Sequence, residues 1–344
     1  MIPLIALVLL GGGADSVHFR PEDIDALPLA LTRVDTRGGR LTIELPTIQV
    51  PAGGTVRTAV HRVAIPFAIS VYGFALELVD ESGATLAPDR LHHIVFNDPD
   101  RRELFLPLAL PIFAASKESP RPVFPKYRIG MLLPKSQRYI IGAMFANPDP
   151  HPRFMTVRLV LSFIRPGRMV PQVYGYGWTL DVTHPLGKEG GRHDFDLPPG
   201  RSVFSWEASP QTAGTIVGMG GHAHDFVTAI QFEDVTAGKV LWRQVPIRDA
   251  DGRLQQITPT RFTRWYRLGK HIQPSHVYRV TVFYDNPTGE LIPHGGMGSV
   301  AGLFVPDRSE RWPRLDPQDP IYRAQIANLL NNMTGVEMSE AHRH

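Results

Sequence analysis

Two histidines separated by one residue, His222 and His224, are the first candidates for chemistry in this sequence. The segments around them, residues 215–217 and 226–232, are rich in β-branched and aromatic residues and therefore predict a strand. Side chains alternate between the two faces of a strand, so residues i and i+2 project to the same face. Two imidazoles side by side would supply two ligands to copper, zinc, iron or nickel. The alternative interpretation is a pair of polar strand residues that face solvent.

A third ligand to such a metal would come from a neighbouring strand, and Met297 is one candidate. It lies in a glycine-rich segment, with glycines at positions 295, 296 and 298 that permit close approach. A thioether is a soft ligand and favours copper, especially Cu(I), over zinc. His294 is the rival candidate, and ordinary core packing is the commoner role of a methionine.

A second histidine pair, His92 and His93, occupies adjacent positions on a predicted strand over residues 91–96. Successive strand residues point to opposite faces, so a regular strand would not present both rings to one metal. A chelating pair needs a β-bulge, or one ring turned so that it binds through its other nitrogen. From the spacing alone we expect one histidine in the core and the other exposed.

Several other kinds of site are not supported by the sequence. Carboxylate pairs of the glycosidase type, glycine-rich phosphate loops and a His-Glu-x-x-His helix are absent, and neither Ser205 nor Ser299 lies in a nucleophile elbow. The chain has no cysteine, which excludes disulfides and thiolate ligands. Lysines and arginines are spread along a chain of formal net charge +3, with no basic–aromatic stripe, so we expect no nucleic-acid partner.

The elements that must position these residues are strands. Strand patterns recur over residues 40–165 and start again near residue 193, with almost no helical periodicity, which predicts an all-β chain. The length of 344 residues is consistent with two sandwiches. A Gly/Pro-rich passage over residues 166–192 predicts the domain boundary. The aromatic run 174–178 within it is alternatively a strand that bridges the two halves.

The two ends of the chain carry different signals. Residues 1–14 combine a short apolar run with small residues, which resembles a signal peptide without its basic region and predicts a periplasmic or secreted protein. A buried strand is the alternative, and the run is too short to span a bilayer. A helix over about residues 320–332 should pack on a sandwich or frame the groove between domains. Its apolar face consists of Tyr322, Ile326, Leu329 and Leu330.

Taken in order, these motifs resemble one enzyme family. The segment Leu91-His92-His93-Ile94-Val95-Phe96, then Pro198-Pro199-Gly200, then His222-Ala223-His224 and a glycine-rich methionine strand resemble the copper type II, ascorbate-dependent monooxygenases. Peptidylglycine α-hydroxylating monooxygenase and dopamine β-monooxygenase are members. The likeness is closer to Cys-poor bacterial and plant relatives, including the stress up-regulated Nod 19 proteins. It covers roughly residues 40–306.

The resemblance implies two jelly-roll-like antiparallel β-sandwiches in tandem, with one copper in each and a solvent-filled cleft between them. It implies that His222, His224 and Met297 hold the copper that activates O₂, and that His92 and His93 hold a copper that relays electrons. The implied division of the chain is a possible signal peptide at 1–14, sandwiches at 15–167 and 168–308, and a tail with one helix at 309–344.

Three departures from the family pattern matter. The third histidine of the electron-relay site is missing, and either Met144, which stands about where it is expected, or His151 would replace it. The basic residue that grips a peptide carboxylate is Gly220 here, and a tyrosine shortly after the methionine is Ala301. Peptide amidation is therefore not expected.

The resemblance therefore predicts a copper-dependent, monooxygenase-like protein that binds one or two copper ions. It would hydroxylate a C–H bond of an unknown small molecule with O₂ and a reductant such as ascorbate. Two alternatives remain. One is a non-enzymatic copper-binding or copper-handling protein that keeps only the second-domain site. The other is a structural or sugar-binding sandwich with incidental histidines.

Overall fold

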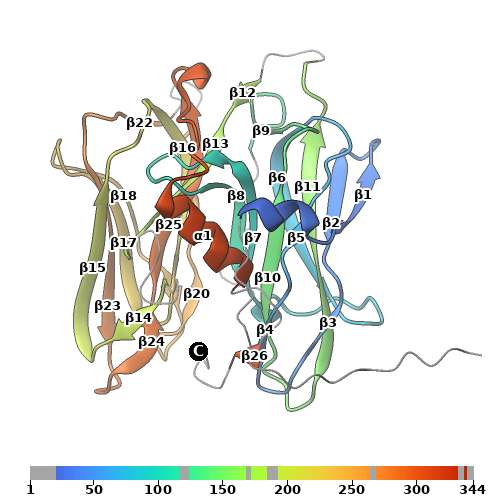
Figure 1. The fold of residues 1–344 in the computed structure, drawn as a ribbon. Helices are drawn as coiled ribbons and strands as arrows, with labels where there is room; N and C mark the ends of the chain where they lie inside the picture. Colours follow the sequence, from blue (N-terminus) through green and yellow to red (C-terminus); the bar gives the residue numbers. More distant parts are fainter. Residues whose placement is uncertain are drawn as a thin grey trace, which may run out of the picture.

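The computed structural model describes residues 21–116, 124–167, 172–183, 193–263, 269–331 and 337–338. Four β-sheets are stacked as layers, two in each half of the chain (Figure 1). The predicted apolar segment at 1–14 lies outside the described residues.

The first sandwich consists of two layers, which are antiparallel except for the edge strand β12. One has the strand order β1-β2-β11-β6-β9-β12, with β3 paired to β11, and the other has the order β26-β4-β10-β7-β8, with β5 paired to β10. The bounds are η1 (Pro21–Ala26), β1 (Leu31–Asp35), β2 (Arg40–Glu44), β3 (Ile48–Val50), β4 (Thr55–Arg57), β5 (His61–Arg62), β6 (Ile69–Val79), η2 (Pro88–Arg90), β7 (Leu91–Arg102), β8 (Ala109–Ser116), β9 (Ile129–Leu133), β10 (Ile140–Ala146), β11 (Arg153–Ile164), β12 (Val173–Tyr174) and β26 (Glu337–Met338).

The second sandwich repeats this plan. One layer has the order β13-β25-β16-β21, with β22 paired to β16, and the other has the order β15-β23-β17-β18; the ribbons β14–β24 and β19–β20 are added. The bounds are β13 (Tyr176–Asp181), β14 (Phe195–Leu197), β15 (Gly200–Ala208), β16 (Gly214–Ala223), β17 (Val227–Asp234), β18 (Lys239–Gln244), β19 (Ile247–Arg248), β20 (Leu254–Gln256), β21 (Thr260–Arg261), β22 (Lys270–Ile272), β23 (Tyr278–Asn286), β24 (Ile292–Gly296), β25 (Gly298–Pro306) and η4 (Ser309–Arg311).

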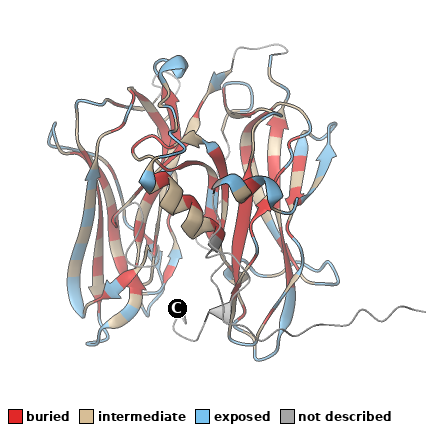
Figure 2. Cartoon of the chain, in the orientation of Figure 1, coloured by how far each residue is buried: buried red, intermediate tan, exposed pale blue. Residues whose placement is uncertain are grey.

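Strand alternation builds one large core inside each sandwich. Buried residues occur along the strands of all four layers (Figure 2). On β10, for example, Ile141, Ala143 and Phe145 enter the first core. The residues between them, among them Met144, point to the opposite face, toward the second sandwich. The predicted fold class, two jelly-roll-like antiparallel sandwiches with a short C-terminal helix, is confirmed.

The chain passes from one sandwich to the other at Gly175. Just before it, β12 pairs in parallel with β9 of the first sandwich, and just after it β13 pairs with β25 of the second. The aromatic run is therefore the bridging strand that the sequence offered as an alternative. A Cβ atom at Gly177 would lie 1.8 Å from the carbonyl oxygen of Pro111, so only glycine lets β13 approach β8 this closely.

The loop after β7 locks the two sandwiches together. Leu104 and Phe105 leave the first sandwich and are buried in the core of the second. The fully buried carboxylate of Glu103 accepts hydrogen bonds from the backbone N–H groups of Phe105 (2.7 Å), Leu106 (2.9 Å) and Thr179 (3.1 Å). Burial raises the pKa of Glu103 to about 7. This one side chain thus ties β13 to the first sandwich.

The predicted tail helix is confirmed as α1 (Pro320–Asn331), and it packs on the first sandwich. The Asp319 carboxylate accepts from the N–H groups of Ile321 and Tyr322, with Pro320 at the first helical position, so the start is well capped. The Tyr322 hydroxyl donates to the carbonyl of Pro99 at 2.8 Å. Among the described residues, no helix is long and apolar enough to cross a membrane.

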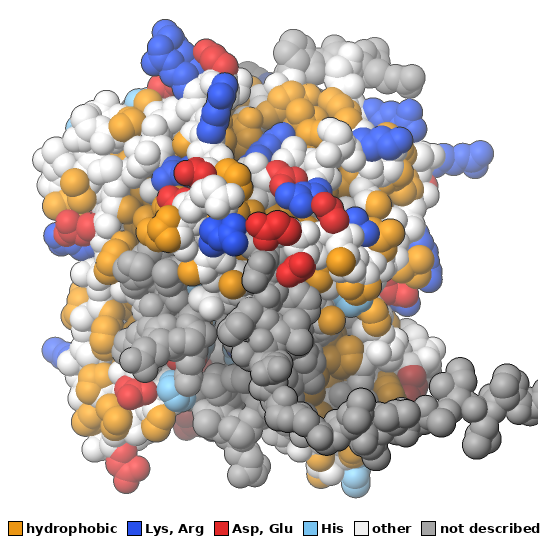
Figure 3. Space-filling view, viewed as in Figure 1, with side chains coloured by type: hydrophobic (Ala, Val, Ile, Leu, Met, Phe, Trp, Pro, Cys, Tyr) orange, Lys and Arg blue, Asp and Glu red, His pale blue; other side chains and the backbone are white. Residues whose placement is uncertain are grey.

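Basic and acidic side chains are intermixed on the face that carries α1 and η1 (Figure 3). Arg323 pairs with Glu22 at 3.2 Å, and Arg138 pairs with both Asp100 and Asp25. Among the described residues, this face therefore has no block of charge of one sign.

Candidate metal centre

The His-x-His pair lies at the end of β16, on the face turned toward the first sandwich. Ala223, between the two histidines, is buried in the second core, whereas His222 and His224 are half-buried. The ring centroids of His222 and His224 lie 5.6 Å apart. The predicted common face of the two histidines is therefore present.

Met297 joins this pair from the junction between β24 and β25. Its Sδ atom lies 3.2 Å from Nε2 of His222. The neighbouring glycines let this junction lie close against the second core, because a Cβ at Gly296 would lie 2.0 Å from Phe195 and a Cβ at Gly298 would lie 2.3 Å from Val282. The thioether and the imidazole thus lie side by side, in the arrangement that the family resemblance implied.

Tyr284, a residue that the sequence analysis did not single out, holds both ligand segments. Its hydroxyl accepts hydrogen bonds from the backbone N–H groups of His224 (3.1 Å) and Met297 (3.1 Å), and it donates to the carbonyl of Met297. Burial raises the pKa of Tyr284 well above its ordinary value, so the hydroxyl keeps its proton.

The adjacent pair His92–His93 is brought together by a β-bulge. In the pairing of β7 with β10, Met144 lies opposite His93 and Phe145 lies opposite Leu91, so His92 is the extra residue. The Nδ1 atoms of His92 and His93 are 3.1 Å apart, and both side chains are half-buried. The expectation of one core and one exposed histidine is therefore wrong, because the bulge interrupts the alternation on which it rested.

The two histidine pairs meet in one cluster between the β10 layer of the first sandwich and the β16 layer of the second. The ring of His92 lies edge-on to the ring of His224, with centroids 6.5 Å apart. Ser116, the neighbour of His93 on β8, has its Oγ 3.4 Å from Nδ1 of His222. Each sandwich therefore contributes a pair to the same cluster.

The other three ligand candidates lie in different surroundings. Met144 is buried, lies directly opposite His93 and shares its face. His151 has an exposed side chain in the turn between β10 and β11, where no described contact joins it to the cluster. His294 adopts a positive φ of 58°, and its Nδ1 lies 3.2 Å from an oxygen of Asp194. Met297, not His294, is thus the side chain beside His222.

The donor atoms of the cluster fit copper. Ligands bound to one tetrahedral ion at about 2.0–2.3 Å lie roughly 3.3–3.6 Å apart. Both the His92–His93 and the His222–Met297 separations are within a few tenths of an ångström of this range. In the described part of the chain no three His, Asp or Glu side chains form a metal-binding group, so the thioethers are needed to complete a site. A ligand set of imidazole and thioether favours copper over hard cations.

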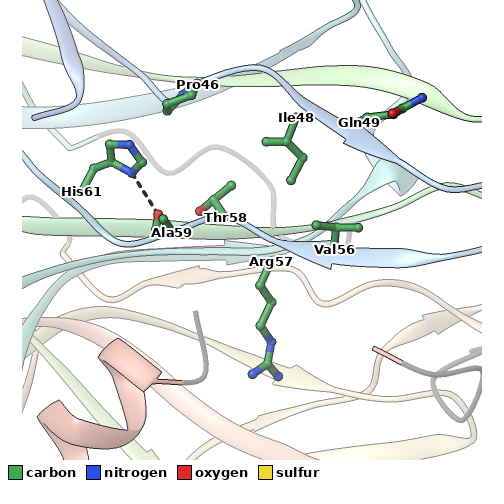
Figure 4. Close-up of a pocket in the computed structure, with 8 residues that line it drawn as sticks. All are labelled: Pro46, Ile48, Gln49, Val56, Arg57, Thr58, Ala59 and His61. Atoms are coloured by element: carbon green, nitrogen blue, oxygen red, sulfur yellow. Dashed lines mark hydrogen bonds between the residues drawn. The ribbon is translucent and has the colours of Figure 1, made fainter. Parts of the chain in front are cut away.

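A separate open pocket of about 450 Å³ lies at the edge of the first sandwich (Figure 4). None of its lining residues belongs to the two histidine pairs. Its one histidine, His61, has its Nδ1 2.9 Å from the carbonyl of Ala59, and Arg57 points away from the other lining side chains. The lining residues are Pro46, Ile48, Gln49, Val56, Arg57, Thr58, Ala59 and His61.

No family model matches the chain, and no curated protein matches it. Among solved structures, the chain is similar to the major capsid protein P2 of bacteriophage PM2, at 12% identity and a TM-score of 0.34, over 78% of this chain and 98% of that one. It is also similar to the VP2 subviral particle of infectious bursal disease virus, at 9% identity and a TM-score of 0.23, over 85% and 79% of the two chains. Likenesses this remote carry no argument about function.

Proposed function

We propose that this protein binds copper at the cluster between its sandwiches and is a copper-dependent, monooxygenase-like enzyme. It would hydroxylate a C–H bond of a small organic substrate with O₂ and a reductant such as ascorbate. The observation that supports this most is the 3.2 Å approach of Met297 Sδ to His222 Nε2, with the His224 ring beside them. A soft sulfur beside imidazole nitrogens favours copper.

The two pairs have different roles in this proposal. His222, His224 and Met297 would hold one ion, and His92 and His93 would hold a second, with Met144 beside them in place of a third histidine. Bound copper supplies the one-electron chemistry and the reaction with O₂.

The protein residues around the cluster position the ligands and limit access. All four histidines and Met297 are half-buried, so they are screened from bulk water but remain reachable. Ser116 contacts His222 from the opposite sandwich, and Tyr284 holds the backbone of His224 and Met297. The first of these contacts links the two sandwiches at the cluster, and the others hold the ligand segments of the second sandwich together.

The proposal also includes a location. An exported protein, periplasmic or secreted, agrees with the apolar run at residues 1–14 and with a redox site that uses no cysteine.

A second candidate function is copper binding without catalysis, at the second-sandwich pair alone. It is favoured by Met144 standing where a third histidine would complete the first pair, and by the lack of a three-residue His, Asp or Glu group among the described residues.

Metal analysis of purified, copper-reloaded protein tests both candidates. The enzyme proposal predicts two coppers per chain, loss of copper in both His222→Ala and His92→Ala, and ascorbate-dependent O₂ uptake that each variant abolishes. One copper, lost only with His222→Ala and without O₂ uptake, would favour simple binding. No copper above background would reject both. His271→Ala is the control, because His271 is exposed, is paired with Asp307, and lies opposite Thr215, seven residues along β16 from His222.

A further inference from the structure

We infer that the Tyr284 hydroxyl is a positioning group that fixes Met297 relative to His222 and His224 and so sets the preference of the site for Cu(I) over Cu(II). This inference rests on the proposed copper binding, but it concerns a residue outside the ligand set. Tyr284 lies on β23, inside the second sandwich, behind the two segments that carry the ligands.

The hydrogen-bonding capacity of this hydroxyl is fully used. It accepts two N–H groups and donates to one carbonyl, and two of these three bonds are to the backbone of Met297 itself. The third reaches His224, which is 73 positions before Met297 in the sequence. One buried oxygen atom therefore holds two ligand-bearing segments in register.

A methionine ligand needs such support more than a histidine does. Its side chain is unbranched and has three rotatable bonds, so it adapts to several positions unless its backbone is held. Met297 itself belongs to neither strand, although Gly296 and Gly298 on its two sides pair with neighbouring strands. The hydroxyl of Tyr284 supplies the missing backbone bonds.

The chain contains its own comparison. Residues 139–148 and 278–287 share a tyrosine at the first position and Asn-Pro at the last two. In this alignment Tyr284 corresponds to Phe145, which is fully buried in the first core and has no hydroxyl. The sandwich fold therefore accepts phenylalanine at this position, and the hydroxyl is present in the copy whose neighbouring strands carry His-x-His and methionine.

The expected loss of affinity depends on the oxidation state of the copper ion. A thioether stabilises Cu(I) more than Cu(II), because soft ligands prefer the softer ion. Freeing Met297 should therefore weaken Cu(I) binding while Cu(II), held mainly by imidazole, is affected much less.

The test compares Tyr284→Phe with Tyr278→Phe. Tyr278 is the matched control: it lies on the same strand, is equally buried, and among the described residues its hydroxyl accepts only the N–H of Gln273. Cu(I) affinity is measured by competition with a Cu(I)-specific chelator, Cu(II) affinity by competition with glycine. We expect Tyr284→Phe to weaken Cu(I) binding by about 10- to 100-fold, as outer-sphere partners typically do, to change Cu(II) binding far less, and to speed amide exchange at His224 and Met297 in the metal-free protein.

A double variant guards against a merely structural effect. If Tyr284 acts through Met297, adding Tyr284→Phe to Met297→Leu will not weaken Cu(I) binding further. Equal losses of Cu(I) and Cu(II) affinity, additive losses in the double variant, or an unchanged ratio in Tyr284→Phe would overturn the inference. Failure of the wild-type protein to bind copper would instead reject the proposed function, and the exchange data would still report the backbone role.

Discussion

The two sandwiches share a corner that is built in the same way. At the end of β10 the Asn147 amide donates to three carbonyls, and at the end of β23 the Asn286 amide does the same. The acceptors are Val50, Pro51 and His151 in the first sandwich and Leu197, Pro198 and Glu290 in the second. The strand order β4-β10-β7-β8 likewise corresponds to β15-β23-β17-β18.

The histidine pairs do not correspond in this comparison. The first pair lies on β7, in the layer that contains β10, whereas the second lies on β16, in the layer opposite β23. The β10 layer of the first sandwich corresponds to the β23 layer of the second, but it faces the β16 layer. The two histidine pairs therefore lie on layers that are not equivalent. The site therefore arises from the stacking of two similar units and not from a motif repeated within each of them.

The largest effect should come from removing the shared corner. Asn147→Ala and Asn286→Ala each remove a buried amide that bonds three carbonyls, and each should lower the free energy of unfolding by roughly 2–4 kcal/mol. Denaturant unfolding of both variants measures this. If only one variant is destabilised, the two corners are not equivalent and the comparison fails.

The contribution of Glu103, at the junction between the sandwiches, to the free energy of unfolding should depend on pH. With its pKa near 7 against an ordinary value of 4.5, Glu103 binds a proton more readily in the folded than in the unfolded state between these pH values. The free energy of unfolding should therefore fall as the pH rises from 4.5 to 7, by up to about 1.4 kcal/mol per pH unit. Unfolding curves of Glu103→Gln, which cannot titrate, should lose this contribution; an identical slope in both proteins would contradict it.

A smaller effect should distinguish Met144 from an ordinary core residue. In a His222→Ala background only the first pair remains for copper. There Met144→Leu, which preserves the volume but removes the sulfur, should weaken Cu(I) binding about tenfold, or 1.4 kcal/mol. Chelator competition measures the change, and unchanged affinity would show that Met144 only fills space.

The smallest effect on copper is expected at His294. Its imidazole is paired with Asp194, and its positive φ is tolerated by asparagine. His294→Asn should therefore leave the copper content unchanged by metal analysis. Loss of one copper in this variant would restore His294 as a ligand in place of Met297.

Much of this arrangement could be predicted from the sequence. Period-2 patterns and the apolar stripe of the tail gave the strands and α1, and spacing alone placed His222 and His224 on one face. The glycines around Met297 correctly indicated a close approach. These features depend on neighbouring residues, which a sequence displays directly.

Other features depend on events that local patterns do not show. The bulge at His92 is a one-residue slip in the pairing of β7 with β10. The meeting of His92 with His224 depends on how two domains stack. Tyr284 did have a signal: the repeated Tyr and Asn-Pro at 139–148 and 278–287, in which Phe145 and Tyr284 differ. Aligning the two halves of the chain would have identified it.

The central claim is that both histidine pairs belong to one copper-binding cluster. Electron paramagnetic resonance of the fully Cu(II)-loaded protein tests it most directly, with His92→Ala and His222→Ala as singly loaded references. Two ions in one cluster predict dipolar broadening and a half-field signal that disappear in either variant. A wild-type spectrum equal to the sum of the two variants' spectra would contradict the claim and would place the ions in separate, non-interacting sites.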